Sequence, residues 1–188
     1  LYIIKEACKD AQKLQKEGTP LSISVNISPK QLESAVFVRE VRRILQEVDL
    51  HDIQLILEVT ERSLLSTSGR ILERIRELKQ LGIQMSMDDF GMGHSSMMYL
   101  QENAFDEVKL DGSLVRQILE NERSRDIVRG ITRLAASMQF HVVAEFVETR
   151  EQMELLKALH CDIYQGYYYG KPCSCDEFII KYLKQEFR

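Results

Sequence analysis

Polar side chains recur at or near the ends of stretches that otherwise have the composition of apolar strands. They are Asn26, Glu58, Asp88 with Asp89, Lys109 with Asp111, Glu145 and Gln165. A buried parallel strand has no structural need for such residues, although a single acid in this position is more often a helix N-cap or a turn residue. The carboxyl ends of the strands of a β/α barrel meet at one face. The succession of polar ends therefore predicts one shared site.

The residue types narrow the chemistry of that site. Asn, Asp and Glu supply hard oxygen ligands without a thiolate or imidazole, which favours Mg²⁺ or Mn²⁺, or else Ca²⁺, over zinc and copper. Several carboxylates in one pocket would repel each other unless cations neutralised them, so we expect two metal ions. Such a pair suits hydrolysis at phosphorus. Lys109 then either holds the nucleophilic water or a phosphate oxygen, or pairs with a surrounding acid.

The two aspartates are followed by a glycine-containing loop. Gly91 and Gly93 give the backbone freedom to turn, and Ser95 or Ser96 could cap the next helix. The third glycine of a dinucleotide-binding fingerprint is absent. We interpret the segment as a mobile loop hinged over a metal site.

These residues are positioned by strands that alternate with helices. Apolar and alternating runs predict strands over 21–27, 53–59, 83–88, 106–111, 141–147 and 162–165. Helical spacing predicts helices over 1–17, 37–48, 68–81, 113–120, 124–138, 149–159 and 174–186. Capping boxes begin the last two, at Thr149 with Gln152 and at Ser174 with Glu177. This alternation predicts an α/β fold of parallel β/α units, as a barrel or an open doubly wound sheet.

The length of the chain limits the number of β/α repeats that it can contain. The chain has 188 residues and no Pro-rich or Gly/Ser-rich linker, so we expect one domain over residues 1–188. A TIM-type (β/α) barrel uses about 31 residues per unit, which leaves room for about six of its eight strands. The expectation is an incomplete barrel that lacks two strands. Its flanking strands would have unpaired backbone groups, which predicts a homodimer.

Composition excludes several classes of protein. The formal charge is −4 and there is no block of Lys and Arg, which argues against binding to DNA or RNA polymers. No apolar run is long enough to span a membrane, and the first 13 residues are amphipathic rather than a signal peptide. We expect a cytoplasmic segment without membrane contact, even if the parent protein is anchored elsewhere.

The four cysteines do not follow the spacing of a disulfide framework or a paired zinc site. We expect Cys8, Cys161, Cys173 and Cys175 to be reduced thiols. A zinc role for Cys173 and Cys175 with a histidine is the less favoured alternative.

Taken together, the motifs resemble the EAL family of cyclic di-GMP phosphodiesterases over essentially the whole chain. In the family's order they are VNIS (25–28) with QL (31–32), EVTE (58–61), DDFG (88–91) with Gly93 and SS (95–96), KLD (109–111), AEFVET (144–149), QGY (165–167) and KP (171–172). The resemblance implies a barrel that uses Mg²⁺ or Mn²⁺ to hydrolyse cyclic di-GMP to linear pGpG in bacterial second-messenger signalling.

The resemblance also implies roles for individual residues. The metal ligands would be Asn26, Glu58, Asp88, Asp89 and Glu145. The catalytic residues would be Glu145 as general base, Lys109 at the nucleophilic water and Asp89 at the second metal. Glu61 would anchor the glycine-containing loop, and Asp111, Glu148 and Gln165 would support the site or bind substrate.

The sequence departs from the family pattern in identifiable places. The Glu-Ala-Leu motif is absent, which implies that the first two strands and one ligand are missing. Arg62, Met92 and His94 replace the usual residues, and Phe146 stands where the family has glycine beside the proposed base. We expect a bulky side chain there to displace or crowd Glu145. The alternative function is a catalytically degenerate module that binds cyclic di-GMP or a protein partner.

Overall fold

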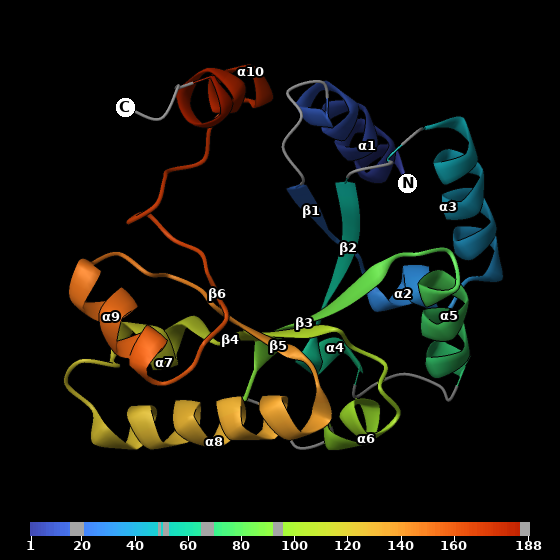
Figure 1. Ribbon diagram of the computed structural model, residues 1–188. Coiled ribbons are helices and arrows are strands. Elements are labelled where there is room, and N and C mark those ends of the chain that lie inside the picture. The colour runs from blue at the N-terminus through green and yellow to red at the C-terminus, as the bar shows by residue number, and fades with distance from the viewer. Residues whose placement is uncertain (16–20, 49, 51–52, 65–69, 92–95, 185–188) are drawn as a thin grey trace. The chain divides into compact units, whose positions relative to one another are not determined.

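The computed structural model describes residues 1–15, 21–48, 50, 53–64, 70–91 and 96–184 (Figure 1). The strands are β1 (Leu21–Asn26), β2 (Ile53–Thr60), β3 (Gln84–Phe90), β4 (Glu107–Leu110), β5 (His141–Ala144) and β6 (Ile163–Tyr164). The helices are α1 (Tyr2–Gln15), α2 (Pro29–Leu32), α3 (Ala35–Glu47), α4 (Glu61–Leu64), α5 (Arg70–Lys79), α6 (Ser96–Gln101), α7 (Gly112–Arg116), α8 (Glu122–Met138), α9 (Arg150–Ala158) and α10 (Cys175–Phe178), followed by the π-helix η1 (Ile179–Leu183).

Strand order distinguishes the two architectures that the sequence left open. The order in the sheet is β1-β2-β3-β4-β5-β6, and the pairs β1–β2, β3–β4, β4–β5 and β5–β6 are parallel. A doubly wound sheet reverses its strand order at a switch point, whereas the strands of a β/α barrel follow one another in chain order. The fold is therefore an incomplete TIM-type barrel with six parallel strands, as predicted.

The chain divides into two compact units. Unit 1 comprises residues 1–58, 68–84 and 172–188, and unit 2 comprises residues 59–67 and 85–171. That residues 1–188 form one domain stays a prediction.

Unit 1 contains the first strand pair and its helices. Helix α1 packs on β1, and α3 packs against α5. The buried faces of these two helices carry Val41 and Ile44 on α3, three positions apart, and Ile71 and Ile75 on α5, four positions apart. This is the spacing that places apolar side chains on one stripe of a helix.

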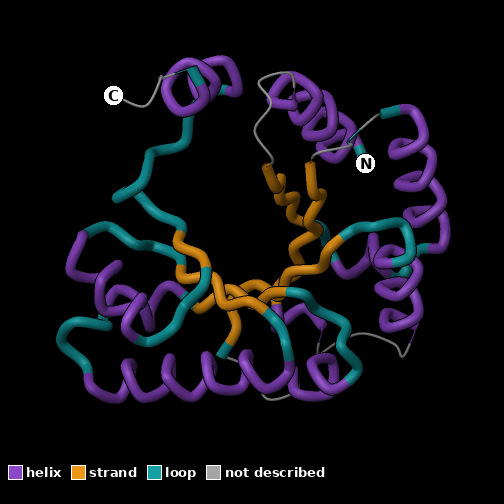
Figure 2. Tube along the Cα trace, viewed as in Figure 1, coloured by secondary structure: helices purple, strands orange, loops and turns teal. Residues whose placement is uncertain are grey.

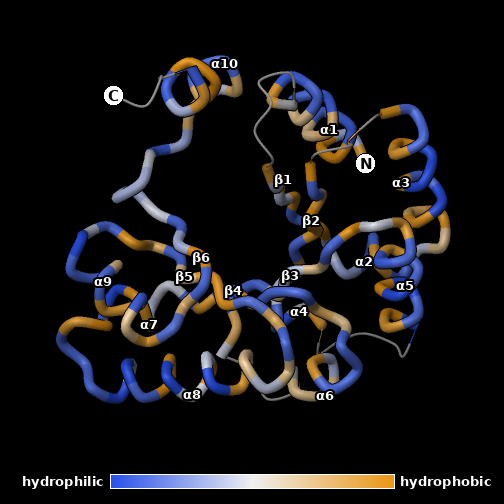
Figure 3. Tube along the Cα trace, viewed as in Figure 1, coloured by the Kyte–Doolittle hydropathy of each residue, from blue (hydrophilic) through white to orange (hydrophobic). Residues whose placement is uncertain are grey.

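Unit 2 contains the run of strands β3 to β6, with its helices outside the row of strands (Figure 2). Helix α8 packs on β5, and α7 packs against α8. Polar and apolar turns alternate along α8 (Figure 3), and its buried residues include Val128, Ile131 and Ala135. Strand β4 is buried at every position, as expected for a parallel strand covered on both faces.

In unit 2, the starts of β3 and β5 are each fixed by hydrogen bonds to an aspartate. The Asp106 carboxylate accepts a hydrogen bond from Met85 N at 2.8 Å, and Asp106 N donates to Met85 O at 2.9 Å. Asp162 repeats this arrangement, because its carboxylate accepts from Val142 N at 2.8 Å and its N–H donates to Val142 O at 3.1 Å. In each case an aspartate before one strand satisfies backbone groups of the preceding strand.

Both predicted capping boxes are present, at the N-termini of α9 and α10. Asn121, where the sequence predicts a break between two helices, is the N-cap of α8 and accepts from Arg123 N and Ser124 N. No described helix is both long and apolar enough to cross a bilayer. All four cysteines are free thiols.

Some predicted bounds were wrong. The strand over 141–147 ends at Ala144, because Phe146 has a left-handed backbone with φ of 55° that a strand does not accommodate. The helix over 113–120 ends at Arg116. The last helix changes to π geometry at Ile179. The short helices α2 and α4 were missed, since four residues carry too little periodicity. Helix α6 begins at Ser96, where the sequence led us to expect a helix after the glycine-containing loop.

Candidate active site

A buried ion pair joins the carboxyl ends of β4 and β5. Lys109 lies on β4 opposite Val143, and Glu145 follows two residues later, just beyond the end of β5. Lys109 Nζ lies 2.7 Å from Glu145 Oε1, and the two side chains are 6% and 14% exposed. Pairing with an acid, one of the two roles that the sequence left open for Lys109, is therefore what the structure shows. A charged donor and acceptor held this close and away from water interact strongly.

The two adjacent aspartates lie in a β-bulge. In the pairing of β3 with β4, Met87 opposes Val108 and Phe90 opposes Leu110, so that Asp88 and Asp89 together face the single residue between them. That residue is Lys109. A bulge re-aims side chains and is frequent beside active sites. Here it places two carboxylates where a regular strand would place one.

The backbone and charge of Asp89 are both unusual. Its φ is 55°, and its N–H donates to Asp88 Oδ1 at 2.9 Å. Partial burial raises the pKa of the Asp89 carboxyl, the negative charges of Asp88 and Asp111 raise it further, and Lys109 opposes the shift. The negative charges of Asp88 and Asp111 thus oppose ionisation of Asp89, and a cation would relieve that repulsion.

Asp111 has a structural role in this arrangement. It is the N-cap of α7, and its Oδ1 accepts hydrogen bonds from Ser113 N at 2.8 Å and from the Ser113 hydroxyl. A supporting role at the site, which the resemblance implied for Asp111, stays a prediction.

The loop after β3 is held at its first residue. Glu61 begins α4, its side chain is buried, and its Oε2 accepts a hydrogen bond from Gly91 N at 3.1 Å. Gly91 has φ of 107°, a conformation that favours glycine. This is the contact that the resemblance implied for Glu61. Met92, His94 and Ser95 lie outside the described residues.

Two predicted ligands belong to unit 1. Asn26 and Glu58 are opposite each other in the register of β1 and β2, so their side chains lie on the same face of the strand pair. Ile27 N donates to Glu58 O at 2.8 Å and continues the pairing past the end of β1. Asn26 is exposed and Glu58 is buried.

Two predicted supporting residues have exposed side chains and well-fixed backbones. Glu148 N donates to Gln152 Oε1 at 2.8 Å. Gln165 N donates to Ala144 O at 2.9 Å, and Gln165 O accepts from Val147 N at 3.1 Å. The Gln165 backbone thus bridges Ala144 and Val147, the residues that flank Glu145 and Phe146.

The structure brings together part of the predicted set. In unit 2, Asp88, Asp89 and Glu145 lie on segments adjacent to Lys109, whereas Asn26 and Glu58 form a pair in unit 1. Within the described ranges, no three His, Cys, Asp or Glu side chains converge closely enough to hold a metal ion by themselves. The amide of Asn26 is a further oxygen donor of the kind that Mg²⁺ and Mn²⁺ accept.

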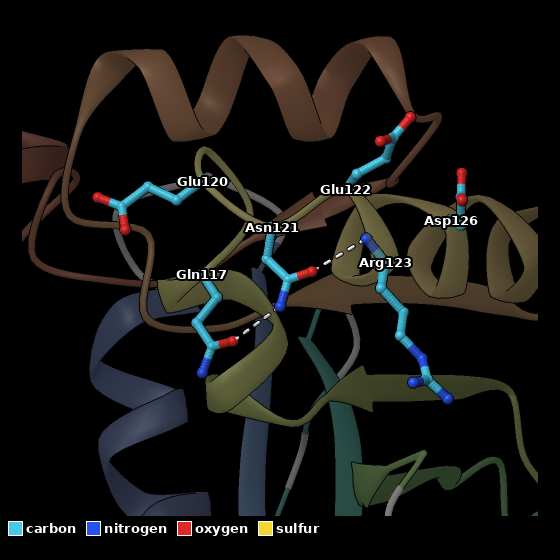
Figure 4. Close-up of a pocket in the computed structure, with 6 residues that line it drawn as sticks. All are labelled: Gln117, Glu120, Asn121, Glu122, Arg123 and Asp126. Atoms are coloured by element: carbon cyan, nitrogen blue, oxygen red, sulfur yellow. Dashed lines mark hydrogen bonds between the residues drawn. The ribbon is translucent and has the colours of Figure 1, made fainter.

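A surface hollow lies away from these strand ends, at the junction of α7 and α8. Figure 4 shows the six residues that line it, which are Gln117, Glu120, Asn121, Glu122, Arg123 and Asp126. Asn121 uses its side chain to cap α8 and to contact Gln117. Asn121 and Gln117 are thus parts of the helix start.

Sequence comparison identifies the family. The EAL domain matches residues 1–172, most of the chain. The chain belongs to the EAL domain family. Among curated relatives, a signaling protein of Caulobacter vibrioides is 40% identical over 175 residues, which are 93% of this chain and 21% of that protein. The cyclic di-GMP phosphodiesterase NbdA of Pseudomonas aeruginosa is 34% identical over 96% of this chain and 24% of its own length.

Solved structures of the EAL family agree with the fold. The EAL domain of Mycobacterium smegmatis DcpA superposes with a TM-score of 0.89 at 27% identity, over 100% of this chain and 84% of that one. A manganese and cyclic di-GMP complex of Klebsiella pneumoniae BlrP1 gives a TM-score of 0.77 at 26% identity, over 89% of this chain and 43% of that one. The EAL chain spans about a fifth to a quarter of the length of the two curated relatives.

Proposed function

We propose that this EAL chain is the catalytic part of a phosphodiesterase that hydrolyses cyclic di-GMP to linear pGpG. The observation that carries the proposal is the buried pair of Lys109 and Glu145 at 2.7 Å, at the end of the strands where β/α barrels place their chemistry. Membership in the EAL family and the relative named as a cyclic di-GMP phosphodiesterase support the choice of substrate.

The donor set suits hard divalent cations. In unit 1, Asn26 and Glu58 offer an amide and a carboxylate oxygen, and in unit 2 the ligands would be Asp88, Asp89 and Glu145. Burial raises the pKa of the Asp89 carboxyl, the negative charges of Asp88 and Asp111 raise it further, and a bound cation would oppose both effects. Two bound Mg²⁺ or Mn²⁺ ions would lower the pKa of a coordinated water and stabilise charge on phosphate oxygens.

The residues of the pair have complementary roles. Glu145 accepts a proton from the attacking water, and the buried ammonium of Lys109 orients the Glu145 carboxylate through their 2.7 Å contact. The same ammonium has three N–H donors, so it can also bind the water or a phosphate oxygen. Glu61 holds the first residue of the loop after β3 through Gly91 N.

The test is the manganese-dependent conversion of cyclic di-GMP to pGpG, with chromatography to measure the product. We expect Glu145→Ala and Lys109→Ala each to lower the rate by about 10²–10⁴-fold, the usual contribution of a positioned acid or base. Arg150→Ala, which removes an exposed ion pair with Glu154, is the matched control and should retain the rate. A complete barrel that carries this chain and shows no turnover would refute the proposal.

Titration calorimetry separates the enzyme from the binding module. The proposed enzyme requires metal to turn over its substrate, whereas tight metal-free binding of cyclic di-GMP without hydrolysis would favour the degenerate module. The homodimer and the cytoplasmic location stay predictions, which sedimentation and cell fractionation of the parent protein test.

A further inference from the structure

Phe146 has a strained backbone directly beside the proposed base. Its φ of 55° lies in the left-handed region, which is uncommon for a bulky residue. Such a conformation costs about 1–3 kcal/mol and persists only where the surrounding structure enforces it. The side chain of Phe146 shows what enforces it.

The Phe146 ring packs on one face of α7. A Cβ atom added to Gly112 would lie 2.4 Å from Phe146 Cδ2 and 2.6 Å from Cε2, so the ring fills the space that any larger residue would need. The Arg116 guanidinium lies over the same ring, with Cζ 4.0 Å from the ring centroid. Gly112 and Arg116 are four residues apart and so share a face of α7.

This packing explains why Phe146 leaves Glu145 in place. The sequence led us to expect that the ring would displace or crowd the base, yet the ring lies on α7 and Glu145 keeps its 2.7 Å contact with Lys109. The ring contacts the first residue of α7, which comes three residues after Lys109, and its own backbone directly follows Glu145. The contact therefore joins the segment that carries the lysine to the segment that carries the glutamate.

We infer that Phe146, Gly112 and Arg116 form a clamp that fixes the ends of β4 and β5 relative to each other and thereby positions Glu145 against Lys109. Gly112 provides the space, Phe146 fills it, and Arg116 covers the ring through a cation–π contact. Phe146 is thus a positioning residue. Its effect on turnover rests on the proposed function, whereas the packing of the clamp does not.

A double-mutant cycle tests the packing, with unfolding in urea as the measurement. Circular dichroism monitors the unfolding, because the chain contains no tryptophan. Gly112→Ala should lower the unfolding midpoint in the native background, because the new methyl group collides with the ring. In the Phe146→Ala background, which keeps the left-handed Cβ and removes the ring, Gly112→Ala should cause no loss. Equal shifts of the midpoint in both backgrounds would overturn the clamp.

Gly130→Ala is the matched control for the glycine substitution. Gly130 lies in α8, and a Cβ added there meets nothing within 4 Å. We expect it to raise the midpoint slightly in both backgrounds, because alanine is the better helix former. Arg116→Met should lower the midpoint in the native background and have no effect once the ring is removed.

Turnover tests the positioning role. Phe146→Ala should lower kcat about tenfold with KM unchanged within about twofold, since a displaced base affects the chemical step more than binding. Phe146→Tyr, which keeps the ring, should restore kcat. Val128→Ala, a buried substitution in α8, controls for lost stability and should retain kcat.

The two ideas fail in different ways. A complete barrel that carries the unsubstituted chain and shows no turnover contradicts the proposed function and leaves the urea cycle to decide the clamp. Coupling in urea with an unchanged kcat in Phe146→Ala contradicts the positioning role.

Discussion

The two strand pairs that carry the predicted site reach it by different backbone routes. In unit 1, β1 and β2 pair one to one over six positions and end with Asn26 opposite Glu58. In unit 2, β3 carries a bulge opposite Lys109, and both Asp89 and Phe146 have left-handed backbones. The first pair relies on register alone, whereas the second uses irregular backbone that the surrounding packing must hold.

The difference indicates where stability and chemistry are coupled. Asn26 is exposed, so its side chain can be changed with little effect on folding. Lys109 is buried and the Glu145 side chain is only 14% exposed, and their contact offsets part of the cost of removing both charges from water. We therefore expect substitutions in unit 2 to affect folding and function together and those at Asn26 to affect function alone.

The largest effect should come from breaking the buried pair. Lys109→Met removes the ammonium that lies 2.7 Å from Glu145, and we expect the free energy of unfolding to fall by about 3–5 kcal/mol. The double variant Lys109→Met/Glu145→Gln should recover part of that loss. Urea unfolding measures both, with Arg150→Gln in the exposed pair with Glu154 as the control, expected to cost under about 1 kcal/mol. An equal cost for the two pairs would remove the distinction between the buried and the exposed site.

An intermediate effect is expected in unit 1, on metal affinity alone. Asn26→Ala should weaken Mn²⁺ binding at least about tenfold, which corresponds to about 1.4 kcal/mol. The free energy of unfolding without metal should change by no more than about 0.5 kcal/mol, because the side chain is exposed. Calorimetric titration with Mn²⁺ measures the first quantity, and Ser24→Ala, at an exposed position two residues earlier, is the control. A large loss of stability in Asn26→Ala would contradict the proposed independence.

The smallest effect concerns pH. Because the pKa of Asp89 is raised in the folded chain, the folded state retains a proton that the unfolded state has already lost above about pH 4. The contribution of Asp89 to stability is therefore most favourable at low pH and declines as pH rises through the raised pKa. Asp89→Asn should flatten this decline in the metal-free chain, measured as the free energy of unfolding between pH 4 and 7. Parallel pH profiles for the two chains would show that repulsion at the bulge is negligible.

Most of the strand and helix framework could be predicted from the sequence. Apolar and alternating runs identified most of the described strands, because buried parallel strands are rich in apolar residues. The caps at Thr149 and Ser174 were recognisable because their hydrogen bonds are local. The end of β5 was misplaced, because Phe146 and Val147 continue the apolar pattern while φ at Phe146 breaks the strand.

The site was predictable in its residue types and less so in its geometry. Register placed Asn26 opposite Glu58 as expected for adjacent parallel strands. The bulge at Asp88 and Asp89 could not be foreseen, because two adjacent acids have the same local pattern in a regular strand. The clamp depends on Gly112 and Phe146, which are 34 positions apart in the sequence, and only the folded chain shows that a missing side chain and a large one occupy the same space.

The paired aspartates at the strand starts have a consequence for how such proteins diversify. Asp106 and Asp162 secure the beginnings of β3 and β5 with hydrogen bonds that involve none of the proposed site residues. A change in the residues at the opposite ends of those strands leaves these anchors intact. A β/α unit can thus acquire new reactive groups at the carboxyl end of its strand while the hydrogen bonds at the amino end stay the same.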